Sequence, residues 1–171
     1  AVPLAKKLKK KVFFLTNRHT QHKIAIDTLQ NMQEKSDELI IVSDIIGKKG
    51  MCSQEVATLF GADFNDFCKS LLDKGNCSYY SKVKGKKGIT VDAEYLIAKI
   101  RAAKPMHTEE LQLAAKREGM CSYEIALELA KKADVIVGDY YYLFNPIVRQ
   151  NILKKLDLAL EDIILIVDEG H

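Results

Sequence analysis

The apolar run Ile163–Val167, which an acidic pair follows at once, constrains the fold of this chain more than any other feature. Five apolar residues without alternation are typical of a strand that is buried on both faces, as in a parallel sheet covered by helices. Asp168 and Glu169 would then lie at the carboxyl end of that strand, where open α/β sheets bind ligands. In ATPases an Asp at this place holds magnesium on the nucleotide phosphates. The alternative is that the two acids only begin a solvated turn.

Further apolar runs predict an early portion of the same sheet. Residues 12–15 indicate a strand that ends in a polar loop, and residues 39–42 indicate a second strand. Between them, residues 21–35 fit a helix with Thr20 as its N-cap and Ile24, Thr28 and Leu29 on one side. A strand, a helix and a strand within about 30 residues form the βαβ unit of a parallel sheet.

The buried-strand pattern returns at residues 135–137 and 163–167, near the end of the chain. Between these runs, Asn145 followed by Pro146 is typical of a helix start, with the Asn as cap and the Pro in the first helical position. We therefore predict an α/β fold in which residues 1–46 and 122–171 build one sheet.

Residues 47–121 differ from their flanks, because they offer short helical patterns and no clear buried strand. The expected helices run from Ser53 as a cap to residue 60, over residues 65–74, from Thr90 as a cap to residue 103, and over residues 108–119. Small helices joined by Gly-Lys loops bury little apolar area, so this insertion needs an organiser such as a metal centre.

Four cysteines fall at wide spacing: Cys52, Cys68, Cys77 and Cys121. Structural zinc usually takes its ligands in pairs separated by two to four residues, and no such pair occurs here. Disulfides are disfavoured as well, because nothing resembles a secretory signal and the chain is long enough to bury a core. Four buried free thiols, or an iron-sulfur cluster held by four separate elements, remain as interpretations.

Charge and composition indicate an intracellular, soluble protein. The net charge is +3, from 26 basic and 23 acidic residues, which is too balanced to indicate nucleic acid by itself. The apolar runs are far shorter than the ~20 residues that cross a membrane. Lysines cluster at 82–87, which is either a solvated loop or a surface that attracts phosphates. We interpret His19, His22 and His107 as polar surface residues.

Several motifs occur together in one order: a hydroxyl-rich turn after an early strand, Gly-Lys-Lys-Gly-Met-Cys, three more cysteines, Asp-Tyr-Tyr-Tyr-Leu-Phe-Asn-Pro, and Val-Asp-Glu-Gly-His. This order resembles the XPD family of superfamily 2 DNA helicases, over essentially the whole chain. The resemblance implies a partial RecA-like parallel sheet of the P-loop NTPase type. A small, mostly helical iron-sulfur domain, residues 47–121, would be inserted between motifs Ia and II.

The resemblance also implies roles for residues of this chain. Cys52, Cys68, Cys77 and Cys121 would hold a structural 4Fe-4S cluster. Asp168 would orient the magnesium of ATP, Glu169 would polarise the attacking water, and His171 would relay the nucleotide state. Gly170 stands where many members have Ala.

Single-stranded or forked DNA is the expected polymer partner. Motif Ia would place Thr16, Arg18, Thr20 and Gln21 on the strand backbone, although the family more often has the Arg directly after the first Thr. Lys48, four residues before the first cysteine, and Tyr140, as a stacking face, are further candidates. The alternatives are a solvated lysine for Lys48 and a core aromatic for Tyr140.

By resemblance, the full-length parent would be an ATP-dependent 5′-3′ DNA helicase of DNA repair. It would be a monomer that can join repair-complex subunits, cytoplasmic in a prokaryote such as an archaeon or nuclear in a eukaryote. No Walker pattern occurs in residues 1–171, so this segment alone should be inactive. Alternatives are a DinG-like or FANCJ-like iron-sulfur helicase, or a non-catalytic metal-binding interaction module.

Overall fold

The computed structural model describes residues 1–36, 38–54 and 59–170. Its helices and strands, in chain order, are α1 (Val2–Leu8), β1 (Lys11–Thr16), α2 (His19–Ser36), β2 (Val42–Ile45), α3 (Gly61–Asp73), α4 (Ser78–Ser81), β3 (Lys84–Gly85), β4 (Gly88–Ile89), α5 (Val91–Ala102), α6 (Thr108–Arg117), α7 (Ser122–Lys132), β5 (Val135–Asp139), α8 (Tyr141–Phe144), α9 (Pro146–Leu156) and β6 (Ile163–Val167).

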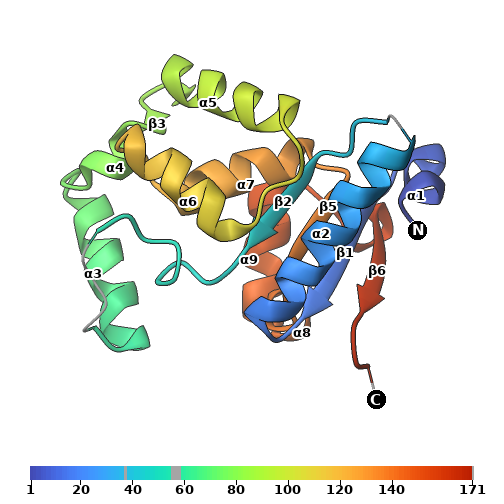
Figure 1. Ribbon diagram of the computed structural model, residues 1–171. Coiled ribbons are helices and arrows are strands. Elements are labelled where there is room, and N and C mark those ends of the chain that lie inside the picture. The colour runs from blue at the N-terminus through green and yellow to red at the C-terminus, as the bar shows by residue number, and fades with distance from the viewer. Residues whose placement is uncertain (37, 55–58, 171) are drawn as a thin grey trace.

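The centre of the molecule is a four-stranded sheet in the order β2-β5-β1-β6 (Figure 1). Every neighbouring pair in it is parallel, with Phe14 of β1 opposite Val137 on one side and Ile166 on the other. The predicted α/β class with a parallel sheet is therefore confirmed. Because the strands are parallel, Thr16, Asp139 and Val167 end at the same edge of the sheet.

Helices cover the two faces of the sheet unequally. One face packs α1 and α2 against β1 and β5 through a cluster that includes Ala5, Val12 and Ile26. Phe13 and Leu15, the alternate residues of β1, point to the other face. That second face is covered by a larger group of helices, α5, α6, α7 and α9 (Figure 1).

Some of the predicted insertion belongs to this larger core. Leu96 and Ile97 of α5 and Leu111 of α6 lie in the same buried cluster as Phe13 of β1. By contrast, α3 lies at the far side of the molecule from β6, and Phe64 is its buried residue (Figure 1). The helix expected from Ser53 falls largely on residues 55–58, which lie outside the described residues.

Two helix starts follow from the capping residues named above. Asn145 Oδ1 accepts hydrogen bonds from the backbone N–H groups of Ile147 and Val148, at 3.1 and 3.0 Å. Thr90 Oγ1 likewise accepts from the N–H of Ala93. These side chains satisfy backbone donors that have no partner within the helix.

Two predictions about burial are wrong. Ile24 of α2 is 64% exposed, whereas His22, Ile26 and Leu29 form the buried side of that helix. Strand β6 is not buried on both faces, since Leu165 is 45% exposed and, in the described residues, β6 pairs only with β1. Both differences arise because the helices leave β6 and the outer side of α2 without a complete cover.

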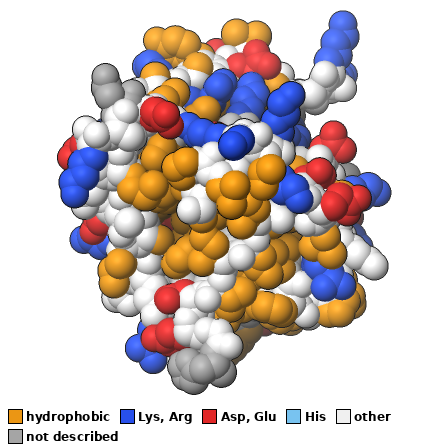
Figure 2. Space-filling view, turned by 90° about the vertical axis from the view of Figure 1, so that its right-hand side faces the viewer, with side chains coloured by type: hydrophobic (Ala, Val, Ile, Leu, Met, Phe, Trp, Pro, Cys, Tyr) orange, Lys and Arg blue, Asp and Glu red, His pale blue; other side chains and the backbone are white. Residues whose placement is uncertain are grey.

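An apolar groove follows from that incomplete cover. It runs between α2 and β6 and is lined by Phe14, Ile24, Ala25, Met32 and Ile166, among others. Figure 2 shows the side of the molecule that carries α1 and β6, where apolar side chains gather in a broad patch bordered by charged ones. No helix in the described residues is long and apolar enough to span a membrane.

Candidate functional site

The acidic pair lies where the sequence predicts it, at the carboxyl edge of the sheet. The backbone N–H of Asp168 donates to the carbonyl of Leu15 at 3.0 Å, which continues the pairing of β6 with β1. Asp168 is half-buried and Glu169 is exposed. His171 lies outside the described residues, so its expected role as a relay stays a prediction.

Tyr140 meets Asp168 across this edge. Its hydroxyl donates to the backbone carbonyl of Asp168, so it braces the turn that carries the acidic pair. Desolvation, together with the carboxylates of Asp168 and Glu169, raises the pKa of Tyr140. The ring also packs edge-on against Phe144, with 6.3 Å between the ring centroids. A base would therefore have to stack on what remains open of this half-buried ring.

The polar turn after β1 reaches the same edge. Arg18 and Thr20 are exposed there, as phosphate contacts require. Thr16 differs, because it is fully buried and its hydroxyl donates to Gln21 Oε1. Gln21 Nε2 in turn donates to Glu169 Oε1 at 3.2 Å. The structure thus brings the residues predicted for motif Ia and the acidic pair into direct contact.

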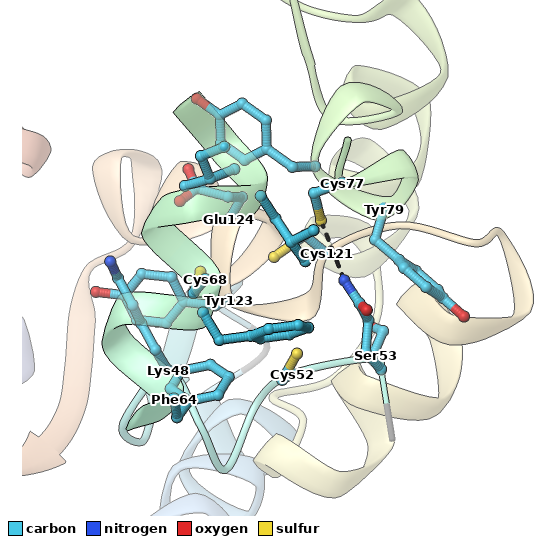
Figure 3. A pocket seen from close by; sticks show the side chains of 15 residues that line it. Lys48, Cys52, Ser53, Phe64, Cys68, Cys77, Tyr79, Cys121, Tyr123 and Glu124 are labelled. Carbon is cyan, nitrogen blue, oxygen red and sulfur yellow. Dashed lines mark hydrogen bonds between the residues drawn. The ribbon is translucent and has the colours of Figure 1, made fainter. Parts of the chain in front are cut away.

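All four cysteines line one cavity (Figure 3), beside α3 and α4 and away from β6 (Figure 1). Cys52 follows β2, Cys68 lies in α3, and Cys77 and Cys121 are the N-cap residues of α4 and α7. Their side chains point into the same space, next to the rings of Phe64 and Tyr123 (Figure 3). Gln54, which also lines this cavity, donates a hydrogen bond from its Nε2 to Cys77 Sγ at 3.5 Å.

The surroundings of Cys52, Cys68 and Cys121 favour the neutral form of these three thiols in the absence of a ligand. Burial raises the pKa of Cys121 to about 12. Burial also raises the pKa values of Cys52 and Cys68, and the nearby Cys77 adds to both shifts. Lys48 opposes the shift at Cys68 through its positive charge. Thiolates that face one cavity disfavour each other's charged form, because like charges repel.

Lys48 lines the cysteine cavity and also contacts a neighbouring aromatic ring. Its Nζ lies 5.7 Å from the centroid of the Tyr123 ring, and Lys155 Nζ of α9 lies 5.2 Å from the same centroid. Such distances are those of cation–π contacts. The Tyr123 ring therefore holds lysines from the loop after β2 and from α9 beside the cysteine cavity.

The four thiols are the donor type that holds iron-sulfur clusters. Across residues 1–36, 38–54 and 59–170, no three His, Cys, Asp or Glu side chains form a group that could hold one ion. A cluster keeps its ligands farther apart, because irons and sulfides lie between them. Four thiols from separate elements around one apolar cavity match that requirement.

A buried polar cluster was missed by the sequence reasoning. His22 is fully buried, so its interpretation as a surface residue is wrong. Its Nδ1 lies 2.5 Å from Asp44 Oδ1, and Asp44 Oδ2 accepts from the backbone N–H of Thr108 at 2.9 Å. The available signal was that His22 shares a helical stripe with Ile26 and Leu29, opposite a strand that carries an Asp.

Comparisons with known proteins identify a family and several relatives of this chain. The family model DEAD_2 matches residues 14–171. The regulator of telomere elongation helicase 1 homolog of Anopheles gambiae is 26% identical over 172 residues, which cover 95% of this chain and 15% of that protein. The Fanconi anemia group J protein homolog of Gallus gallus is 24% identical over 165 residues, covering 94% of this chain and 12% of that protein.

Solved structures show the same fold. One described as truncated XPD superposes with a TM-score of 0.63 at 22% identity, over 99% of this chain and 43% of that one. A second, described as XPD helicase, gives a TM-score of 0.59, also at 22% identity, over 96% of this chain and 25% of that one. Since the family model covers most of the chain, the protein belongs to the DEAD_2 family, and its fold is that of the two XPD structures.

Proposed function

We propose that this chain belongs to the motor of an ATP-dependent DNA helicase that moves 5′ to 3′ and serves DNA repair. The chain spans 15% or less of the length of the curated relatives that it matches, so the activity belongs to the full-length protein. Asp168 would hold Mg2+ on the ATP phosphates, and Glu169 would take the proton of the attacking water. Displacement at the γ-phosphate needs positioned charge, which adjacent carboxylates at a strand end supply.

One observation carries the proposal: Gln21, in the first turn of α2, donates to Glu169, just beyond the end of β6. In a helicase motor, DNA binding has to be coupled to ATP hydrolysis. Gln21 and Glu169 lie 148 positions apart in the sequence, and their hydrogen bond would link the two proposed sites. Their contact at the carboxyl edge of a parallel sheet matches the place where such folds bind nucleotides. Arg18 and Thr20, exposed beside Gln21, would contact the phosphates of single-stranded DNA.

The four cysteines would hold a 4Fe-4S cluster in the cavity that they line. When bound, the cluster supplies four iron–thiolate bonds that tie Cys52, Cys68, Cys77 and Cys121 together. Because α3 buries little apolar surface of its own, these bonds would fix its position against α4 and α7. A surface fixed in this way can separate the strands of a DNA duplex as the motor advances.

Two alternatives make different predictions. The similarity to the Fanconi anemia group J homolog supports a FANCJ-like helicase as strongly as an XPD-like one, and a DinG-like enzyme would share the same chemistry. A non-catalytic metal-binding module would need no nucleotide site. A Gly-Lys-Thr loop encoded upstream of residue 1 would favour a motor over that module.

The decisive experiment is the replacement Glu169→Gln in the full-length protein. ATP hydrolysis should fall by about two to four orders of magnitude while nucleotide binding persists, because the amide keeps the shape of the side chain but takes up no proton. Glu161→Gln, at an exposed position before β6, serves as the matched control and should hydrolyse like wild type. Equal turnover in both variants would remove Glu169 from the mechanism.

A further inference from the structure

A chain of hydrogen bonds runs from the buried end of β1 to the acidic pair. Thr16 Oγ1 donates to Gln21 Oε1, and Gln21 Nε2 donates to Glu169 Oε1 at 3.2 Å. Gln21 itself sits in the first turn of α2, where its backbone N–H donates to the carbonyl of Arg18 at 2.9 Å. These hydrogen bonds therefore connect the turn that carries Arg18 to Glu169, the proposed base.

The burial of Thr16 and the chemistry of Glu169 determine which group donates in each of these hydrogen bonds. Thr16 has no exposed surface, so its hydroxyl needs a partner inside the protein. The partner is the amide oxygen of Gln21, which leaves the amide NH2 group to face Glu169. A carboxylate only accepts hydrogen bonds, so this orientation suits Glu169. Thr16 thus orients Gln21, and Gln21 restrains Glu169.

Glu169 is held in an uncommon conformation. Its φ of 49° lies in the left-handed region, which residues other than glycine rarely adopt. Such conformations persist where neighbouring contacts impose them, and they occur often at functional sites. Tyr140 braces the backbone of this turn, and the hydrogen bond from Gln21 restrains the exposed carboxylate of Glu169.

We propose that Gln21 is a positioning residue that restrains Glu169 until a DNA strand engages the β1–α2 turn. The proposal rests on the function proposed above. DNA phosphates that bind at Arg18 and Thr20 would draw away the Gln21 amide, whose NH2 group is as good a donor to phosphate as to carboxylate. Glu169 would then be free to turn toward the attacking water. Hydrolysis without DNA would be slow because the base is occupied.

Thr16 allows this coupling to be tested without touching DNA. In the full-length protein, Thr16→Val keeps the size of the buried side chain but removes the hydroxyl that orients Gln21, and Gln21→Leu removes the amide itself. We expect both variants to raise ATP turnover without DNA severalfold and to lower the ratio of DNA-stimulated to basal turnover. Asn31→Leu, an exposed amide replacement farther along α2, should behave as wild type.

Coupling between two sites is reciprocal, which gives a second readout without any hydrolysis. Glu169→Ala and Glu169→Gln both remove the negative charge, but only alanine also removes the oxygen that accepts from Gln21. Without nucleotide, the alanine variant should therefore bind a single-stranded oligonucleotide severalfold more tightly than the glutamine variant. Fluorescence anisotropy measures both affinities at one salt concentration.

The outcomes separate the inference from the function on which it rests. A wild-type protein whose hydrolysis DNA does not stimulate would contradict the proposed function and the restraint together. If wild type is stimulated while Thr16→Val and Gln21→Leu keep the basal rate of wild type, Gln21 is only a DNA contact. Lower turnover at saturating DNA in both folded variants, or equal DNA affinity in the two Glu169 variants, would equally overturn the restraint.

Discussion

The carboxylate of Asp44 is paired with the imidazole of His22 inside the core, with 2.5 Å between Asp44 Oδ1 and His22 Nδ1 and no exposed surface on either side chain. A carboxylate only accepts, so His22 Nδ1 carries the proton of this hydrogen bond. Thr108 completes the cluster, since its backbone N–H donates to Asp44 Oδ2 and its hydroxyl donates to the Asp44 carbonyl. The cluster fastens α2, β2 and α6 to one another.

The first prediction concerns the stability that this cluster contributes. Burial alone would raise the pKa of Asp44, but the hydrogen bonds and charge of His22 and the hydrogen bonds of Thr108 outweigh it and lower the pKa. Asp44→Asn should therefore cost about 1.5–3 kcal/mol at pH 7, the range for a hydrogen bond to a charged group. This loss of unfolding free energy can be measured by urea titration of the full-length protein, in which hydrogen–deuterium exchange of peptides from α2 and β2 reports unfolding.

The pH dependence provides the control for this prediction. A carboxyl whose pKa is lowered by folding stabilises the protein above its unfolded value, near 3.8, and this stability is lost as the pH falls through the folded value. The difference between wild type and Asp44→Asn should thus shrink below about pH 4. Asp27→Asn, at an exposed position of α2, should show no comparable difference. A pH-independent gap would contradict the assignment.

The second prediction concerns the cysteine cavity. Anaerobically purified full-length protein should be brown and carry about four irons per chain, as one cubane requires. Cys68→Ser should lower the iron content and expose α3 and α4 to trypsin at Lys69, Lys74 and Lys82. Lys99 and Lys116 should stay protected, because α5 and α6 pack into the core of the sheet. Stoichiometric zinc without iron would exclude the cluster.

The third prediction separates the motor from strand separation. Cys68→Ser removes a cluster ligand but leaves Asp168 and Glu169 in place at the opposite side of the molecule. The variant should keep most of its DNA-stimulated ATP hydrolysis and lose unwinding. Both activities are measured on one preparation of known iron content. If hydrolysis and unwinding fall together in a protein whose sheet remains folded, this division of labour does not hold.

The fourth prediction concerns Lys48. Its side chain lies over the Tyr123 ring beside the cysteine cavity, where its charge would attract a DNA phosphate. Lys48→Glu should weaken binding to single-stranded DNA, and more so at low salt, where release of counterions dominates the affinity. Lys132→Glu reverses an exposed charge at the end of α7 and serves as control. Equal losses in the two variants would indicate a nonspecific charge effect.

The fifth prediction concerns the helix that leads to β6. Asn145→Ala removes the side-chain oxygen that accepts from Ile147 and Val148, so α9 should lose about 1 kcal/mol of stability. Hydrogen exchange of the first turn of α9 should rise accordingly. Asn145→Asp, which retains an acceptor, should remain close to wild type, and equal exchange in both variants would argue against the cap.

Local patterns predict those elements whose cause is local. Asn145 and Thr90 cap helices as expected, and β6 covers the predicted residues, because capping and apolar runs depend on near neighbours. The apolar run predicts the second strand at residues 39–42, whereas β2 is Val42–Ile45. Ser43 and Asp44 look like the polar end of a strand, but partners far along the chain satisfy them.

Long-range contacts account for what the sequence does not reveal. The contact of Gln21 with Glu169 depends on β1 lying beside β6, and the pairing of His22 with Asp44 depends on the packing of α2 on β2. The family resemblance predicts that the four cysteines gather around one cavity. Their spacing alone does not, because it also allows four separate free thiols. The division of the chain into residues 47–121 and its flanks stays a prediction.

The shared core of α5, α6 and the sheet has a consequence for how this protein can be altered. An insertion that folded separately could be deleted and its flanks rejoined. Here the deletion of residues 47–121 would also remove Leu96, Ile97 and Leu111 from around Phe13 and Leu15, and would leave Asp44 without Thr108. In a chimera of two relatives, the outer helices α3 and α4 could be exchanged. Helices α5 and α6 would have to come from the same relative as the sheet that they cover.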